Sequence, residues 1–370
     1  MSHERWPKKS LGEVVHLKRG FDLPTSARSE GPYPVVGSAG VSGWHFEKRA
    51  SGPGVTLGRS GSSMGNATYC PGDFWPLNTT LFVEDFLGNE PYYVYHLLRT
   101  IDFTAYNSGS AQPSLNRNYI ENIRIPVAPR GAQIRISELA GALDKKIAAN
   151  ERVARTSEEL IEALFSPDRS NKQTKLENLC TLRKEQVKPT EVTDPVVAHF
   201  SLPAYDADRT PEYVSPCTIK SAKFLVNTSA VLLSKLNPEI PRIWNMTPEP
   251  GIPALASTEF LVLEPRKGVS TSELWGVTRQ RDFLESLTSK VTGTSKSHQR
   301  VRPVEVMTST VVDPRAFNNE RGQAEALSRR AAIARLENRS LTQLRDTLLP
   351  KLISGELRIK DAEKQVEDAV

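Results

Sequence analysis

The feature that most constrains this chain is a helical segment that occurs twice. The stretch from Ala324 to Leu357 has a weaker copy in mid-chain, and the two copies align through matching pairs: Asn150 with Asn338, Val153 with Leu341, Leu160 with Leu348, Ile161 with Leu349 and Leu164 with Leu352. A repeat that recurs after about half the chain predicts a molecule built from two similar units in series.

Each copy has the spacing of a coiled-coil helix. In the first, a helix predicted over 133–165, the seam positions alternate in steps of three and four: 143, 146, 150, 153, 157, 160 and 164. Only Leu143, Val153, Leu160 and Leu164 of these are apolar, so this helix needs a partner to be stable. The second helix, predicted over 318–351, has on its seam Leu327, Ala331, Ala334, Asn338, Leu341 and Leu348.

An asparagine lies at a matching seam position of both helices. In coiled coils, a buried polar residue at a core position fixes the register at some cost in stability. If the two helices pair antiparallel, Asn150 and Asn338 would face each other near the middle; the alternative is that both are solvated. The residues predicted to pair the helices and set their register are Asn150, Val153, Leu160, Leu164, Asn338, Leu341 and Leu348.

The segments that precede the two helices follow one order, which is a helix, a polar glycine-containing loop and an apolar strand. In the first half these are predicted at 90–104, 107–118 and 123–127, and in the second half at 273–288, 293–303 and up to 312. The predicted class is therefore α+β, with the following limits: a first domain at 1–129, a first spacer helix at 130–167, a second domain at 168–314, a second spacer helix at 315–354, and a flexible tail at 355–370.

Composition excludes several classes of protein. The 370 residues, 38% hydrophobic and 25% charged, are typical of a folded globular chain. The cysteines Cys70, Cys180 and Cys217 are far apart, and none belongs to a Cys-x-x-Cys pair, so neither a zinc site nor a disulfide framework is indicated. No run approaches the roughly 18 to 20 apolar residues that a bilayer span needs. We therefore expect a cytoplasmic protein that does not contact a membrane.

The chain lacks the motifs of enzymes that act on DNA. An adenine methyltransferase needs an Asn/Asp-Pro-Pro-aromatic loop, but Asn237-Pro238 is followed by Glu239. A restriction-type nuclease needs an acidic-x-Lys pair to hold a metal, and none follows Asp168. The six histidines are scattered singly, so no metal cluster or Ser/His/Asp set is indicated. We predict a non-catalytic chain without a cofactor.

Two segments have the side chains of a surface for nucleic acid. Between Ser286 and Val304 there are four cations, Lys290, Lys296, Arg300 and Arg302, and no acidic residue. The net charge of +5 is mild, so this local concentration is more informative than the total. The segment 54–66 lacks the Gly-Lys-Ser/Thr ending of a phosphate-binding loop. It is predicted to be a strand that leads into an exposed turn, with a plain surface turn as the alternative.

Four motifs, together with their order along the chain, resemble the specificity subunits of type I restriction–modification systems. They are Leu349-Pro-Lys-Leu-Ile-Ser-Gly-Glu-Leu357, Ala142-Leu-Asp-Lys-Lys-Ile147 with Asn150, Gly109-Ser-Ala-Gln-Pro-Ser-Leu-Asn-Arg117, and Gly293-Thr-Ser-Lys-Ser-His-Gln-Arg-Val-Arg-Pro303. The resemblance covers nearly the whole chain and implies two target recognition domains separated by two long helices that form an antiparallel coiled coil.

The resemblance also implies partners. Each domain would read one half of a split, asymmetric site in double-stranded DNA, and methylase subunits, two of them, would dock on the spacer and the domains. A restriction/translocase subunit would join where the system has one. A helix of about 33 residues spans roughly 50 Å, which exceeds one duplex turn of about 35 Å. A spacer of this length could hold the two domains at half-sites about one turn apart. The alternative is a coiled-coil scaffold that binds protein and has no DNA sequence specificity.

Affinity for DNA would come from lysine and arginine on phosphates, and discrimination from side chains that reach base edges. The candidates in the first domain are Arg59, Ser60, Asn66, Gln112, Ser114, Asn116 and Arg117. Those in the second domain are Lys235, Asn237, Lys296, His298, Gln299, Arg300 and Arg302. Asparagine and glutamine suit adenine, and arginine suits guanine.

Overall fold

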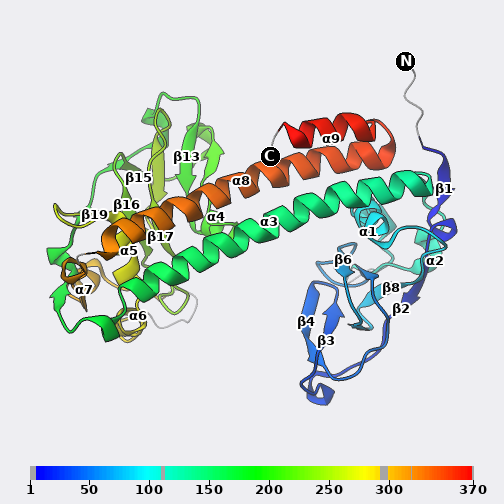
Figure 1. The fold of residues 1–370 in the computed structure, drawn as a ribbon, viewed down its shortest axis with the longest axis horizontal. Coiled ribbons are helices and arrows are strands. Elements are labelled where there is room, and N and C mark those ends of the chain that lie inside the picture. Colours follow the sequence, from blue (N-terminus) through cyan, green and yellow to red (C-terminus); the bar gives the residue numbers. More distant parts are fainter. Residues whose placement is uncertain (1–5, 110–112, 292–298, 318, 369–370) are drawn as a thin grey trace. The chain divides into compact units, whose positions relative to one another are not determined.

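The structure, a computed structural model, describes residues 6–109, 113–291, 299–317 and 319–368. The chain divides into two compact units, residues 1–146 with 340–370 and residues 147–339. Each unit contains one mixed α/β domain and one part of each of two long helices, α3 (Arg130–Leu164) and α8 (Glu320–Ser354) (Figure 1).

The first unit contains two sheets and a separate strand pair. One sheet has the antiparallel order β2 (His16–Arg19), β8 (Thr80–Asp85), β5 (Gly54–Gly58) and β6 (Ala67–Cys70). The other has the order β4 (Gly40–His45), β3 (Tyr33–Gly37) and β7 (Trp75–Pro76), and β1 (Lys8–Ser10) pairs with β9 (Arg124–Pro126). Helix α1 (Pro91–Arg99) shares the core of β5, while the short α2 (Arg117–Ile120) precedes β9.

The second unit repeats this plan and adds to it. Its first sheet has the order β11 (Cys180–Arg183), β19 (Phe260–Pro265), β16 (Ala230–Ser234) and β17 (Ile243–Met246). The second has the order β12 (Gln186–Val187), β15 (Lys223–Val226), β18 (Ala254–Ser257), β13 (Val197–Phe200) and β14 (Glu212–Val214), and β10 (Gln173–Lys175) pairs with β20 (Thr310–Val312). Its helices are α4 (Leu202–Ala207), α5 (Thr271–Thr278), α6 (Arg281–Thr288) and α7 (Pro303–Met307).

The strand order makes the internal repeat visible. The sheet β2-β8-β5-β6 has the same topology as β11-β19-β16-β17, and β4-β3-β7 has the same topology as β14-β13-β18. In each of the latter sheets one pair is parallel, β3 with β7 and β13 with β18. Strands β12 and β15 are an addition of the second unit. The predicted α+β class with two similar units is thus confirmed.

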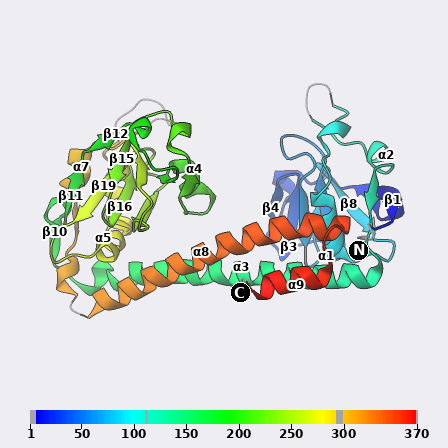
Figure 2. The ribbon, with the colours of Figure 1, turned by 90° about the horizontal axis from the view of Figure 1, so that it is seen from above.

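The two long helices lie side by side in both views and pack antiparallel within each unit (Figures 1 and 2). In the first unit Ile136 and Ala140 of α3 share a core with Leu348 and Leu352 of α8. In the second unit a later residue of α3, Ala154, packs with earlier residues of α8, a cluster completed by Ala331 and Ala334. Residues further along α3 therefore meet residues earlier in α8.

The predicted seam of α3 is partly wrong. Leu143, Asn150 and Ser157 are buried as predicted, but Leu160 is 49% exposed, whereas its neighbour Ile161 is 1% exposed. Val153 is half-buried, and the small Ala154 takes its place at the interface. The prediction favoured large apolar side chains, whereas facing alanines let two helix backbones approach closely and exclude larger neighbours from the contact line.

Each of the two seam asparagines bonds to the opposite helix rather than to the other asparagine. The side-chain amide of Asn150 donates to Glu337 at 2.8 Å, and that of Asn338 donates to the carbonyl oxygen of Ile147 at 3.0 Å. Both bonds cross between α3 and α8 within the second unit. The reason is that each asparagine finds a different acceptor on the opposite helix, so a cross-helix hydrogen bond is kept without an Asn–Asn pair.

Two other expectations are corrected. The helix predicted over 273–288 is two helices, because the side-chain amide of Gln280 donates to the carbonyls of Gly276 and Glu162 and fixes a break between α5 and α6. The tail expected to be flexible contains α9 (Ile359–Glu367), whose Ala362 is fully buried in the core of the first unit. The tail has apolar residues at helical spacing, but the segment is too short for this spacing alone to predict a helix.

Close packing between α3 and α5 yields a stability prediction. A methyl group added at Gly276 would lie 2.6 Å from Cδ2 of the fully buried Phe165 and 3.1 Å from Cγ2 of Ile161. Gly276→Ala should therefore lower the free energy of unfolding by about 1–3 kcal/mol. The control, Gly141→Ala in α3, meets only Tyr92 at 3.8 Å and should stabilise by about 0.5–1 kcal/mol. Equal urea denaturation curves for the two variants would contradict this account of the contact.

A buried histidine predicts acid sensitivity of the first unit. His96 is 2% exposed, and burial lowers its pKa to about 4, although the Asp144 carboxylate is 3.8 Å away. Because the unfolded chain binds this proton near pH 6.5, stability is fully present above that pH and is lost as the pH falls toward 4, by about 3 kcal/mol in total. His96→Phe should lose this part of the dependence. Urea denaturation at pH 7, 6, 5 and 4 measures the free energy of unfolding of both proteins. An identical dependence of this free energy on pH in the two proteins would contradict the prediction.

Candidate nucleic-acid interface

In the first unit, two segments predicted separately as binding segments are joined. The backbone N–H of Leu115 donates to the carbonyl of Arg59 at 2.8 Å, and that of Gly61 donates to Pro113 at 3.0 Å. Ser60 and Ser114 consequently face each other in an isolated antiparallel bridge. The turn after β5 and the loop before α2 thus form one surface.

A third segment, the turn before β8, completes this surface. The N–H of Arg59 donates to the carbonyl of Thr79 at 2.9 Å, and its guanidinium donates to the carbonyl of Asn78 at 3.1 Å. The hydroxyl of Ser38, at the β3–β4 turn, also donates to Thr79, at 2.5 Å. Arg59 is therefore oriented by main-chain acceptors and keeps its positive charge.

The second unit contains the same arrangement of three hydrogen-bonded segments, which we call the frame. The N–H of Val301 donates to the carbonyl of Lys235 at 3.1 Å, and that of Asn237 donates to Gln299 at 2.8 Å. The N–H of Lys235 donates to Glu259 at 2.9 Å, as Arg59 does to Thr79. An isolated bridge here joins Leu236 to Arg300.

These bonds define position-by-position equivalents between the two units. Arg59 corresponds to Lys235, Ser60 to Leu236, Gly61 to Asn237, Thr79 to Glu259, Ser114 to Arg300 and Leu115 to Val301. The anchors are conserved in kind, since Leu115 and Val301 are 2% and 1% exposed. The turn is conserved as well, since Gly61 and Asn237 both have a positive φ, 82° and 48°. Between these anchors, the side chains that face outward differ.

Ion pairs shape the second of these surfaces. The Arg300 guanidinium contacts both carboxylate oxygens of Glu259 at 3.1 Å, and this bond lowers the pKa of Glu259. Arg302 pairs instead with Glu305 in the first turn of α7, and its guanidinium Nη2 is 2.5 Å from the carboxylate. Arg302 therefore supports the helix start as well as presenting charge, whereas Arg300 lies directly on the shared frame.

The other residues predicted to bind DNA lie at different places in the structure. Asn116 caps α2 by accepting from the N–H of Asn118 at 3.1 Å, and Arg117 is the exposed first residue of that helix. The carbonyl of Asn66 accepts from Gly58 at 2.7 Å, and its side chain is exposed. Three candidates lie outside the described residues, namely Gln112, Lys296 and His298.

Sequence reasoning missed a cationic hollow next to Lys235. The hollow has a volume of about 600 Å³, and Lys184 and Arg183 line it together with Phe224, Phe260 and Met307. Lys184 follows β11 in a short segment with acidic neighbours, so no charge run marked it in the sequence. The alignment of β11 with β19 brings it near the frame.

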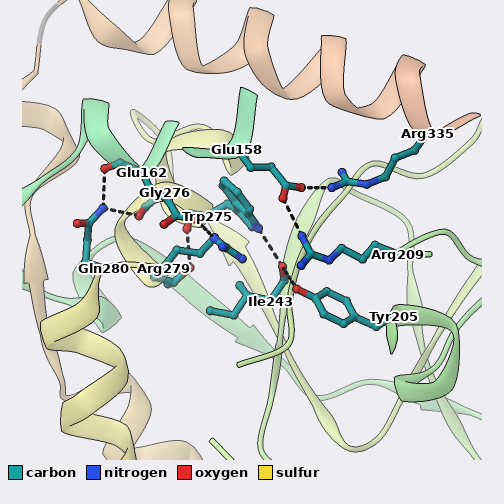
Figure 3. A network of polar contacts seen from close by, with 11 residues as sticks. Glu158, Glu162, Tyr205, Arg209, Ile243, Trp275, Gly276, Arg279, Gln280 and Arg335 are labelled. Atoms are coloured by element: carbon teal, nitrogen blue, oxygen red, sulfur yellow. Dashed lines mark hydrogen bonds and ion pairs between the residues drawn. The ribbon is translucent and has the colours of Figure 1, made fainter. Parts of the chain in front are cut away.

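A polar network holds this second domain to both long helices (Figure 3). The carboxylate of Glu158 on α3 accepts from Arg209 at 2.7 Å and from Arg335 of α8. At a second point Arg279 donates to Glu162 of α3. The second domain is thus joined to α3 at two points, through Arg209 and through Arg279, within one unit.

Among the described residues, no group of three or more His, Cys, Asp or Glu side chains is placed to hold a metal ion. No helix in this part of the chain is both long enough and apolar enough to cross a membrane.

Comparisons with known proteins agree with this arrangement. Residues 3–155 match the family model described as the type I restriction modification DNA specificity domain. A curated relative, the type I restriction enzyme EcoprrI specificity subunit of Escherichia coli, is 28% identical over 177 residues, which are 45% of this chain and 44% of that protein. The match thus spans less than half the length of the curated relative.

A solved structure supports the fold along the chain. The S subunit of a type I restriction–modification system from M. genitalium aligns with a TM-score of 0.65 and 16% identity over 94% of this chain and 96% of that chain. The fold class is therefore that of a two-domain protein with paired long helices. Residues 3–155 thus match a type I restriction modification DNA specificity domain, and the chain is similar in sequence to a type I specificity subunit over somewhat less than half of its length.

The turn at Asn237 yields a prediction that separates backbone from side chain. Because φ is 48° there, Asn237→Gly should keep the fold and remove only the side chain's predicted contact with DNA, whereas the β-branched Asn237→Val should destabilise by about 1–2 kcal/mol. Unfolding and DNA binding would be measured on both variants. A large loss of affinity in a stably folded Asn237→Gly would show that the side chain itself contacts DNA.

Proposed function

We propose that this chain is a DNA specificity subunit that reads an asymmetric bipartite site and assembles methylase subunits around it. The observation that carries the proposal is the shared backbone frame: one arrangement of three segments occurs in both units, with different outward side chains. A protein that reads two half-sites of different sequence needs this combination, because the duplex backbone is the same in both halves and the bases are not.

The chemistry of the two frames supports different half-sites. The first frame presents small hydroxyl side chains, Ser60 and Ser114, which suit contacts of either donor or acceptor type. The second presents Arg300, whose fork suits the O6 and N7 of guanine in the major groove. The candidate residues given above remain predictions of DNA contact.

The proposed role is non-catalytic and needs no cofactor. It is supported by the sequence, which lacks the Asn-Pro-Pro-aromatic loop of an adenine methyltransferase and an acidic-x-Lys pair after Asp168. Methyl transfer would be performed by the methylase subunits, two of them in this proposal, and DNA cleavage by a restriction subunit where one is present. The complex would act in the cytoplasm.

An exposed apolar hollow on the helix pair supports methylase docking. Within the second unit, Leu160 and Leu164 of α3 and Leu327 of α8 line a hollow of about 660 Å³. Apolar side chains gathered between helices without a covering element are typical of a protein interface. The 49% exposure of Leu160 would then reflect its contact with a partner rather than with α8.

The predicted domain limits, 1–129 and 168–314, form part of this proposal. They are supported by the start of α3 at Arg130 and by the end of β20 at Val312.

Affinity purification from the native cell together with methylation-sensitive sequencing tests the function. We expect a methylase with the Asn-Pro-Pro-aromatic motif to co-purify, and genomic adenines to be modified in a split, asymmetric sequence that disappears when this chain is deleted. The protein-scaffold alternative predicts co-purifying proteins and an unchanged methylation pattern after deletion. The latter result would overturn the proposal.

A further inference from the structure

We propose that Arg19 and Lys184 are equivalent phosphate contacts, one in each half-site, and that the outward positions which differ between the two frames contact bases. This rests on the proposed function and assigns two residues that neither charge runs nor motifs in the sequence indicated.

The equivalence follows from strand register. In the first unit Leu57 of β5 pairs with Leu81 of β8, which pairs with Arg19 of β2. In the second unit Leu233 of β16 pairs with Leu261 of β19, and Arg183 of β11 pairs with the next residue, Val262. Lys18 therefore corresponds to Arg183, and Arg19 corresponds to Lys184.

An ion pair that occurs in both units confirms this alignment and separates the two cations on each strand. Lys18 pairs with Glu84 at 2.6 Å, and Arg183 pairs with Glu264 at 2.8 Å, where Glu84 and Glu264 are themselves equivalent. The next residues, Arg19 and Lys184, are exposed and form no ion pair with any described residue. The first cation of each strand is thus neutralised by a partner, while the second keeps its charge for a ligand.

Both exposed cations lie beside the frame. The residue after Arg19, Gly20, donates its N–H to Thr80 at 3.0 Å, next to the Thr79 carbonyl that accepts from Arg59. Lys184 lines the same hollow as Lys235. Each unit therefore has two unneutralised cations, Arg19 with Arg59 and Lys184 with Lys235, at the same end of the same three strands.

A phosphate contact differs from a base contact in whether the position carries a positive charge in both units. A phosphate looks the same in any sequence, so a position that contacts it keeps its cation when the half-site changes. Both cation positions fulfil this condition. Three neighbouring positions do not, since Ser60, Thr79 and Ser114 are replaced by Leu236, Glu259 and Arg300. Glu259 is a positioning residue in this scheme, because its carboxylate accepts from Nε and Nη2 along one edge of the Arg300 guanidinium.

The experiment uses the full chain with its methylase subunits and measures binding to the specific duplex and to a random duplex over a range of salt. Arg19→Ala and Lys184→Ala should each weaken binding to both duplexes by a similar factor, about tenfold, and reduce the salt slope by about one unit. The matched control is Lys18→Ala, which removes the neighbouring, already paired cation of β2 and should leave the slope unchanged.

The base-contact position Arg300 is tested by Arg300→Lys, and the residue that positions it is tested by Glu259→Gln. We expect relaxed methylation specificity at one position of one half-site, with the salt slope retained for Glu259→Gln. The inference is overturned if Arg19→Ala and Lys184→Ala bind with wild-type affinity and slope, or if they alter the methylated sequence instead. If the proposed function itself were wrong, the wild-type complex would not distinguish the two duplexes, which is a separate outcome.

Discussion

One backbone contact determines the architecture of each candidate interface. In both units a buried aliphatic residue, Leu115 or Val301, donates its N–H to the carbonyl of the cation that directly follows β5 or β16, namely Arg59 or Lys235. Burial of the aliphatic side chain anchors the described residues next to it, and the hydrogen bond sets their register against the strand. Because neither interaction uses the outward side chains, those are free to differ without loss of the frame.

The helix pair shows a similar division between packing and polar contacts. Alanines at the interface of the second unit allow close approach of α3 and α8, while Asn150 and Asn338 each donate one hydrogen bond across it. Small side chains provide little apolar area, so polar contacts such as that of Glu158 with Arg335 and Arg209 supplement them. The same carboxylate bonds to a helix and to the domain, which couples the position of the frame to the helix pair.

Much of the architecture could be predicted because it depends on local spacing. The repeat of Asn150 in Asn338 and the apolar periodicity of the helices indicated two similar units. The polar loops around Ser114 and Arg300 were predicted to bind DNA, and the structure joins each to a second segment through a β-bridge. The helix seam was partly mispredicted, because size and hydrophobicity rank Leu160 above Ser157, whereas burial depends on which direction each residue faces. Lys184 was missed because its relation to Lys235 exists only across three paired strands.

The sequence by itself thus determined the class of fold, the duplication and the absence of known catalytic motifs, since these are properties of composition and spacing. Only the tertiary structure decided which residues are equivalent. Arg59 with Lys235, and Lys18 with Arg183, are matched by hydrogen-bond register and by a repeated ion pair, and insertions of different length separate them along the chain. Alignment by residue number cannot detect such pairs, because strand pairing brings together residues that are far apart in sequence.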